Sequence, residues 1–254
     1  MSVDGLSVAA VVVTHNSERF LRELIASIQG QTRVPDEVIV IDDHSSDATV
    51  ALARSAGWRV ETATSPATDT ATRIAQNFTQ GLRAARDFDI AILSDHDDYW
   101  LPNRLEHQAQ EFLVHPDAWM LASDGRIMNS ENTLRDTFPV PPDWEKMSRA
   151  KRLRYALRHS IATGGACAVR PAVLLDPENK AVPVPEGWLH DRWWSLAAVA
   201  TDALQIDSQT VIEYRVQGDQ QVGLERGRQA DSLPRPQLRD VAKLRSIARL
   251  VTGM

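Results

Sequence analysis

The chain has few of the features that mark secreted, membrane-spanning or repetitive proteins. Its 254 residues include one cysteine, Cys167, which excludes an internal disulfide framework and fits a reducing compartment. The apolar run nearest the start, residues 8–13, is too short for a signal peptide or a membrane span. No stretch repeats at a fixed period or is low in complexity. We therefore expect a folded protein of the cytoplasm.

An excess of positive charge is also missing. The chain has 28 Lys and Arg against 34 Asp and Glu. A general affinity for nucleic acid depends on neutralising phosphates, so this balance predicts no nucleic-acid partner. Any phosphate group that the protein binds needs a dedicated site. Hydrophobic residues make up 43% of the chain, which is enough to fill a substantial core.

The C-terminal stretch differs in charge from the rest. Residues 224–254 contain seven Lys or Arg against three Asp or Glu. We expect residues 1–223 to form one domain and residues 224–254 to form a basic helical tail. Such a helix is more often solvated than bound to a membrane, and both interpretations stay open.

Short apolar runs alternate with amphipathic stretches along most of the chain. In the first half, strands are expected over 7–13, 37–41, 58–63 and 90–93, with helices between them. In the second half, helices are expected over 102–114, 149–159 and 188–200, and strands over 119–122, 203–206 and 210–214. This alternation indicates an α/β domain with parallel units, in which ligands bind beyond the carboxyl ends of the strands.

The most informative polar segment follows the expected strand at 90–93. Asp95, Asp97 and Asp98 place three carboxylates within four residues, and their mutual repulsion is costly without a cation. Oxygen ligands of this kind suit Mg2+ or Mn2+, which bind through one or two carboxylates together with substrate phosphates. The alternative is an acidic start to the next helix, where carboxylates are also favoured.

Two other polar clusters are expected at the same edge of the sheet. Asp42 and Asp43 end the second strand and either accept hydrogen bonds from a ribose or base or cap the next helix. The segment Thr14 to Asn16 ends the first strand, and ordinary loop chemistry explains it equally well.

A third acidic position, Asp191, lies far along the chain. It follows His190 and stands among Trp188, Trp193 and Trp194. Burial among these rings would raise the affinity of the carboxylate for a proton, as suits a general base. A helix-capping aspartate among core tryptophans is the alternative.

Two rival motifs are absent. No Gly-x-Gly-x-x-Gly segment follows a strand, which disfavours a standard nicotinamide dehydrogenase. Gly218 and Gly223 have the glycine spacing of a P-loop, but Leu224 and Glu225 stand where Lys and Ser or Thr are required.

Together these segments resemble family 2 glycosyltransferases of the GT-A fold, and especially their bacterial rhamnosyltransferase-like branch. The resemblance covers roughly residues 6–223. It is carried by the strand and loop at 12–16, by the Val-Ile-Asp-Asp segment at 40–43 with Ser45, Asp47 and Thr49, and by Ser94 to Leu105. It implies one Rossmann-like α/β domain with a mixed, mostly parallel sheet flanked by helices.

The resemblance also implies roles for single residues. Asp95 and Asp97 would form the family's Asp-x-Asp motif, with Asp97 as a ligand of Mn2+ or Mg2+. Asp191, in a segment similar to the family's His-Asp-x-Trp, would be the catalytic base. The nucleotide-sugar site would comprise Thr14, His15, Asn16, Asp43, Arg73, Asn77, Asp95, His96 and Arg215.

One position departs from the family pattern. The segment from Glu213 to Gly218 looks like the family's Tyr-Arg-x-His-Gly, but Gln217 stands where histidine is usual. Gln217 would then be the second metal ligand, and an amide oxygen is a poorer ligand for a divalent ion than an imidazole nitrogen. Metal affinity is expected to be low, or Arg215 carries more of the phosphate charge.

The resemblance implies an inverting transfer of a hexose to a hydroxyl group. Rhamnose on dTDP is the first expectation for the donor, with UDP- or GDP-linked sugars as the other candidates. The acceptor is expected to be a cell-surface polysaccharide or lipid-linked intermediate at the inner face of the membrane. A phosphatase or phosphotransferase using Asp95, and a relative that binds nucleotide sugars without turnover, are the alternatives.

Overall fold

The structure is a computed structural model that describes residues 5–216. Gln217, the Gly218 to Gly223 segment and the expected tail at 224–254 lie outside the described residues. Within the part that is described, no helix is both long and apolar enough to cross a membrane.

One sheet of eight strands organises the described chain, in the order β3-β2-β1-β4-β7-β6-β8-β5. The strands are β1 Val8–Thr14, β2 Glu37–Asp42, β3 Arg59–Thr62, β4 Ile90–Asp95, β5 Tyr99–Trp100, β6 Met120–Ile127, β7 Cys167–Val169 and β8 Leu204–Tyr214. The first four run parallel, whereas β7 is antiparallel to both of its neighbours and β5 is antiparallel to β8. The expected mixed sheet of an α/β domain is therefore confirmed.

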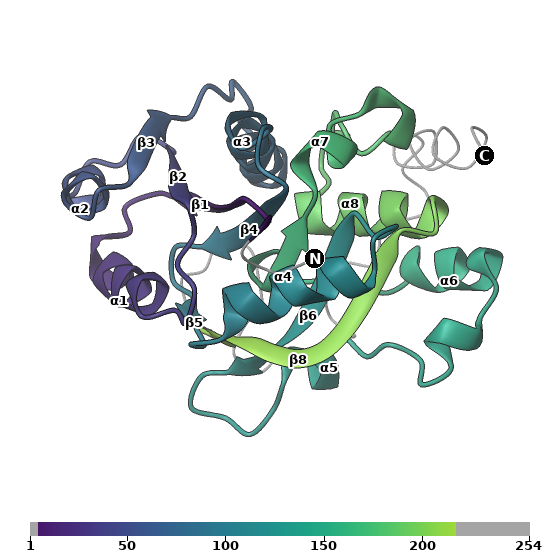
Figure 1. Cartoon of the computed structure of the whole chain (residues 1–254). Coiled ribbons are helices and arrows are strands. Elements are labelled where there is room, and N and C mark those ends of the chain that lie inside the picture. Colours follow the sequence, from purple (N-terminus) through teal and green to yellow (C-terminus); the bar gives the residue numbers. More distant parts are fainter. Residues whose placement is uncertain (1–4, 217–254) are drawn as a thin grey trace.

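Helices cover both faces of this sheet (Figure 1). They are α1 Glu18–Gln29, α2 Thr49–Ser55, α3 Thr70–Ala84, α4 Arg104–Val114, α5 Leu134–Thr137, α6 Arg149–Ala156, α7 Pro171–Leu174 and α8 His190–Ala200. Short 3-10 turns occur at Trp144–Lys146, Gly164–Ala166 and Pro177–Asn179. Because side chains alternate between the faces of a strand, β1 contributes to two separate cores. One core includes buried residues of α3 and α8, and the other includes those of α1 and α4.

Close packing of α3 against the sheet depends on a glycine. A Cβ atom at Gly81 would lie 2.3 Å from Cγ1 of Val11 on β1. The bare backbone at this position lets α3 approach the sheet, and this places the first turn of the helix beside the ends of β1 and β2.

The strand register brings the expected polar segments to one edge. Thr14 on β1 pairs with Asp42 on β2, and Val13 on β1 pairs with Asp95 on β4. Three loops that are separate in the sequence therefore leave the sheet side by side.

The end of the described chain differs from the sequence-based expectation. Instead of two short strands at 203–206 and 210–214, there is one strand, β8. Its middle residues Ser208 and Gln209 are exposed, and their polarity mimics a turn in the sequence. The strand continues because β6 pairs with it on both sides of an irregularity near Asp124.

Candidate active site

The acidic segment forms a tight turn between β4 and β5. The backbone N–H of Asp95 donates to Oδ2 of Asp98 at 3.2 Å, and the Asp98 N–H donates to the Asp95 carbonyl at 3.4 Å. Asp97 and Asp98 are buried. Desolvation, together with the nearby charges of Asp97 and Asp191, raises the pKa of Asp95 to about 7. Desolvation and the charges of Asp95 and Asp97 also raise the pKa of Asp98 well above its usual value.

A second turn, Thr163 to Gly165, presses against this acidic turn. A Cβ atom at Gly165 would lie 2.1 Å from Oδ2 of Asp98 and 3.3 Å from Oδ2 of Asp95. The N–H of the preceding Gly164 donates to Oδ2 of Asp191 at 3.0 Å. One glycine pair therefore contacts both the acidic turn and Asp191, and no other residue type fits at Gly165 without displacing a carboxylate.

Asp191 is the second residue of α8. The N-cap of this helix is Leu189, which makes no side-chain capping bond. Oδ1 of Asp191 accepts from the Arg192 N–H at 2.7 Å, while Trp193 and Trp194 are buried in the core. The carboxylate therefore satisfies amides of its own helix and of the Gly164 turn, and it keeps part of its surface exposed.

The first two loops are joined by their own side chains. Asp42, which is buried, accepts from the Thr14 hydroxyl at 2.9 Å and from the Ser45 hydroxyl at 2.6 Å. Thr14 is fully buried, and its hydroxyl is already bound to Asp42. A contact of its side chain with a nucleotide stays a prediction. Asp43, by contrast, forms an ion pair with Arg73 of α3, with Oδ2 and Nε 2.8 Å apart.

His15 and Asn16 line the same loops. Nδ1 of His15 lies 2.6 Å from the Asp43 carbonyl oxygen, and Oδ1 of Asn16 accepts from the Ser46 N–H at 2.9 Å. Asn16 adopts a φ of 47°, a left-handed conformation that asparagine tolerates better than most residues. Desolvation lowers the pKa of His96 on the acidic turn. The charge of Asp97 opposes this change and that of His15 adds to it.

Two buried polar side chains, on α3 and at the start of α8, lack hydrogen-bond partners. Among the residues that the structure describes, neither amide atom of Asn77 nor either ring nitrogen of His190 makes a hydrogen bond. The His190 ring stacks on Phe78 of α3 at 3.9 Å, and desolvation lowers its pKa to about 4. His190 is therefore a neutral ring, and a Cβ atom at Gly164 would lie 2.7 Å from its Nε2.

Arg215, just after β8, reaches the backbone of the acidic turn. Its Nε donates to the Asp97 carbonyl at 3.3 Å, and its Nη2 donates to Glu23 of α1 at 2.5 Å. The guanidinium also lies 4.8 Å from the centre of the Phe20 ring. The guanidinium of Arg215 is thus held beside Asp97, and its role toward a phosphate stays a prediction.

Sequence reasoning missed Arg104 and Gln108 on α4. Arg104 is fully buried, lies over the Trp100 ring at 4.2 Å and donates from Nη2 to the Leu93 carbonyl at 2.8 Å. Its charge acts on Asp95 and Asp98, because it opposes the rise in both of their pKa values. One sequence feature could have indicated Arg104: it is a charged residue next to the apolar Leu105 in the first turn of an expected helix.

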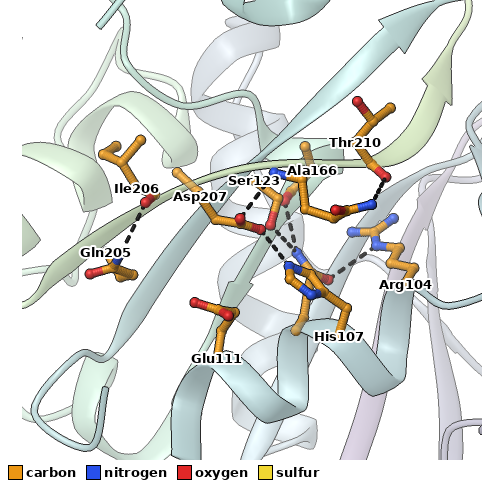
Figure 2. A network of polar contacts seen from close by, with 12 residues as sticks. Arg104, His107, Glu111, Ser123, Ala166, Gln205, Ile206, Asp207 and Thr210 are labelled. Atoms are coloured by element: carbon orange, nitrogen blue, oxygen red, sulfur yellow. Dashed lines mark hydrogen bonds and ion pairs between the residues drawn. The ribbon is translucent and has the colours of Figure 1, made fainter. Parts of the chain in front are cut away.

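Gln108 continues this contact toward the glycine turn, and Figure 2 labels Arg104, Ser123 and Ala166, which it bonds. Its Oε1 accepts from Nε of Arg104 at 3.2 Å. Its Nε2 donates to the Ser123 hydroxyl and to the Ala166 carbonyl, both at 3.0 Å. Since Ala166 directly follows Gly165, the buried hydrogen bonds of Arg104 and Gln108 connect the end of β4 with the glycine turn.

The structure therefore assembles most of the residues expected from the sequence. Within residues 5–216, however, no group of three or more His, Cys, Asp or Glu side chains is arranged to hold a metal ion by itself. The role of Asp97 stays a prediction, and Gln217 lies outside the described residues.

Solved structures with a similar fold include those of two other proteins. S. aureus TarS, in a crystal structure of residues 1–349, has a TM-score of 0.62 at 20% identity, covering 83% of this chain and 60% of that one. Glucosyl-3-phosphoglycerate synthase from Mycobacterium tuberculosis has a TM-score of 0.56 at 19% identity, covering 98% of this chain and 78% of that one. These likenesses show the fold, and the fold agrees with the expected GT-A architecture.

Curated relatives and a family profile add sequence evidence. The uncharacterized protein Rv1520 of Mycobacterium tuberculosis is 30% identical over 139 residues, which cover 54% of this chain and 40% of that protein. The matched region is thus less than half of that relative's length. The profile of the family described as Glycosyl transferase family 2 matches residues 9–175, which is well over half of the chain. The chain belongs to glycosyl transferase family 2.

Proposed function

We propose that this protein is a nucleotide-sugar-dependent glycosyltransferase with Asp191 as its catalytic base. The observation that carries the proposal is the Gly164-Gly165 turn, which contacts Asp191 on one side and the carboxylates of Asp95 and Asp98 on the other. A base for the acceptor and an acidic corner for the donor diphosphate thereby lie against the same backbone.

The donor is proposed to bind across the ends of β1, β2 and β4. S. aureus TarS has been crystallised with UDP-GlcNAc, and the Mycobacterium tuberculosis synthase with Mn2+ and UDP. Asp43, which pairs with Arg73, would contact the nucleoside, and Arg215 lies beside Asp97. We assign the donor to this edge, with UDP, dTDP or GDP as its nucleotide.

A divalent cation fits the chemistry of the acidic turn. Oδ1 of Asp98 is buried without a partner in the described part of the chain, and desolvation together with the charges of Asp97 and Asp191 raises the pKa of Asp95. Asp97 would hold Mn2+ or Mg2+, and Gln217 is the proposed second ligand. When bound, such an ion neutralises charge on the leaving diphosphate.

The proposed chemistry at Asp191 is removal of a proton. Its carboxylate takes the proton of an acceptor hydroxyl as that oxygen forms a bond to the anomeric carbon, while the bond from that carbon to the diphosphate oxygen breaks. Attack from the opposite side inverts the configuration. The Gly164 N–H holds Oδ2 of Asp191 in place, so the orientation of the base is fixed before the substrate binds.

The finer assignments rest on the resemblance of the sequence to the rhamnosyltransferase-like branch. They are a rhamnose donor on dTDP, and an acceptor in cell-surface polysaccharide or glycolipid synthesis at the inner face of the membrane. Division of the chain into a transferase domain at 1–223 and a basic tail at 224–254 that contacts the membrane belongs to the same proposal.

The alternatives are less well supported by the topology. A phosphotransferase that uses an Asp-x-Asp pair carries its nucleophile after the first strand, whereas Asp95 ends β4. A relative that binds nucleotide sugars without turnover would keep the donor edge but release no nucleoside diphosphate. Slow hydrolysis of a labelled nucleotide sugar without acceptor distinguishes this case from an active transferase.

Asp191→Asn tests the proposal, because it removes the base and keeps the shape of the side chain. Release of nucleoside diphosphate from a panel of dTDP-, UDP- and GDP-sugars should fall by roughly 10²–10⁴-fold, while nucleotide binding by calorimetry stays unchanged. Asp202→Asn is the matched control, since Asp202 lies beyond the other end of α8 in an ion pair with Arg152. An Asp191→Asn variant that kept most of its activity would show that the base is elsewhere.

A further inference from the structure

The exposed side of α6 carries a concentration of positive charge that the proposed chemistry does not use. Lys151, Arg154 and Arg158 are spaced by three and four residues, which places them on one face of the helix and its final turn. All three are exposed, whereas Leu153 and Ala156 on the opposite face are buried. We call these three residues the basic face of α6.

Charges around the basic face do not neutralise it. In the described part of the chain, none of its three residues forms an ion pair, and Asp202 pairs instead with Arg152 of the same helix. Exposed Lys146 and Arg149 add charge at the start of the helix, while Asp143 and Glu145 precede it. The surface of α6 therefore carries a local excess of positive charge, although the net charge of the chain is -6.

The apolar side of α6 is already covered. Leu153 and Ala156 pack in the same core as Trp193 and Leu196 of α8, and Figure 1 shows the two helices as neighbours. The helix therefore has no free apolar face to insert into a bilayer. Any partner of the basic face must be recognised by charge alone.

The α6 helix lies close to the turn that holds the proposed base. This position fits a membrane partner, because the proposed acceptor is at the inner face of the membrane. The Leu157 carbonyl accepts from Nη2 of Arg192 at 3.3 Å, which joins the end of α6 to the first turn of α8. Gly164 is six positions after Arg158, so the Arg158 end of the basic face lies within about 20 Å of the glycine turn that holds Asp191. A surface docked on the basic face would lie beside the acceptor side of the site.

We propose that the basic face of α6 docks this protein on a bilayer that contains anionic phospholipids. Each basic side chain near such a surface gains attraction to the lipid headgroups, and the attraction falls off within a Debye length. Nucleic acid is the less favoured partner because Tyr155, the aromatic residue on α6, is stacked on His159 and donates its hydroxyl to Pro139. No ring on the helix is therefore free to stack on bases.

The test is sedimentation of the full chain with vesicles of phosphatidylglycerol and phosphatidylcholine, and with vesicles of phosphatidylcholine alone. Wild-type protein should bind the first kind at low salt and release at high salt. The triple variant Lys151→Gln, Arg154→Gln, Arg158→Gln should bind roughly a hundredfold more weakly. The charge-preserving variant Lys151→Arg, Arg154→Lys, Arg158→Lys should bind like wild type.

The matched control removes three exposed arginines elsewhere, Arg54→Gln, Arg83→Gln and Arg86→Gln, and should leave vesicle binding unchanged. Equal losses in this control and the first variant, or no loss in the first variant, would overturn the assignment to α6. Binding to a labelled DNA duplex but not to vesicles would overturn the lipid assignment. Vesicle binding needs no catalysis, so this test stands or fails separately from the proposed transferase activity.

Discussion

At the scale of single residues, the candidate site depends on two glycines, Gly164 and Gly165. Gly165 leaves room for Asp98 and Asp95, and Gly164 leaves room for His190 while its N–H binds Asp191. Neither glycine has the positive φ of a turn residue. Their role is to let the backbone come close to Asp98 and His190. The sequence does not reveal this role, whereas in the structure a larger side chain would collide with these residues.

Gly165→Ala should disturb the acidic turn. The added Cβ would lie 2.1 Å from Oδ2 of Asp98, so the carboxylate must move, at a cost in folding stability of roughly 1–3 kcal/mol. We expect calorimetry to show weaker Mn2+-dependent nucleotide binding. Gly5→Ala is the control, because nothing lies within 4 Å of a Cβ there. Unchanged nucleotide binding in Gly165→Ala would argue against a donor site at this turn.

His190 predicts a pH dependence of stability. Burial lowers its pKa to about 4 in the folded protein, against about 6.5 in an unfolded chain. The unfolded chain therefore takes up this proton first as pH falls, so stability is lost between about pH 6.5 and about pH 4. The loss attributable to His190 at about pH 4.5 is roughly 2–3 kcal/mol.

His190→Phe isolates this effect, because it keeps a ring against Phe78 and removes the proton-binding nitrogens. Urea unfolding should show a smaller fall in the free energy of unfolding between about pH 7 and about pH 4.5 than in wild type. His159→Phe, at an exposed histidine, is the matched control. An identical fall in wild type and His190→Phe would contradict the neutral, buried state of His190.

At the scale of elements, α4 connects the parts of the site. Its first residue, Arg104, donates to the Leu93 carbonyl on β4, and Gln108 one turn later donates to the Ala166 carbonyl just after the glycine turn. A second contact, His107 to Asp207 at 2.8 Å, ties α4 to β8. The helix thereby fixes β4, the glycine turn and β8 relative to one another.

Arg104→Met should weaken this arrangement. The substitution keeps the length of the aliphatic stem but removes the donor to Leu93 and the positive charge near Asp95 and Asp98. Removing one partner of a buried charged group typically costs roughly 3–5 kcal/mol of folding stability. Chemical denaturation at about pH 7 measures the cost, with Arg54→Met on the exposed side of α2 as the control. A cost no greater than that of the control would show that the charge of Arg104 is not needed.

At the scale of the whole molecule, the site is closed by segments from both ends of the described chain. Arg215, after the last strand, reaches Glu23 on α1 and the Asp97 backbone. A ligand at the donor edge would therefore contact the first, middle and last segments together. Its binding should stabilise the folded state as a unit, because a ligand that binds only the folded state shifts the unfolding equilibrium.

Thermal unfolding tests this expectation. At a hundredfold excess over its Kd, the correct nucleoside diphosphate should raise the Tm by roughly 5–10 °C. The series is UDP, dTDP and GDP, each with Mn2+ and with a chelator, in wild type and in Asp97→Asn. A shift that is equal with and without Mn2+ would sink the metal role of Asp97. No shift with any of the three nucleotides would contradict the donor edge.

Much of the fold followed from local pattern in the sequence. The apolar runs predicted β1, β2 and β4 to within about two residues, because strand periodicity and flanking polar residues are local properties. The same reasoning placed Thr14, Asp42 and Asp95 at one edge, since parallel strands present their carboxyl ends together. It failed at β8, where polar residues in the middle of a strand imitated a turn.

The sequence by itself thus determined the α/β class, the positions of the acidic segments and the candidate residues for donor and base. Only the tertiary structure decided which of them meet. Asp191 joins Asp95 and Asp98 through Gly164 and Gly165, and Arg104 is buried below them. The physical reason is that such contacts depend on how helices pack on the sheet, and packing joins residues whose separation along the chain carries no periodic signal.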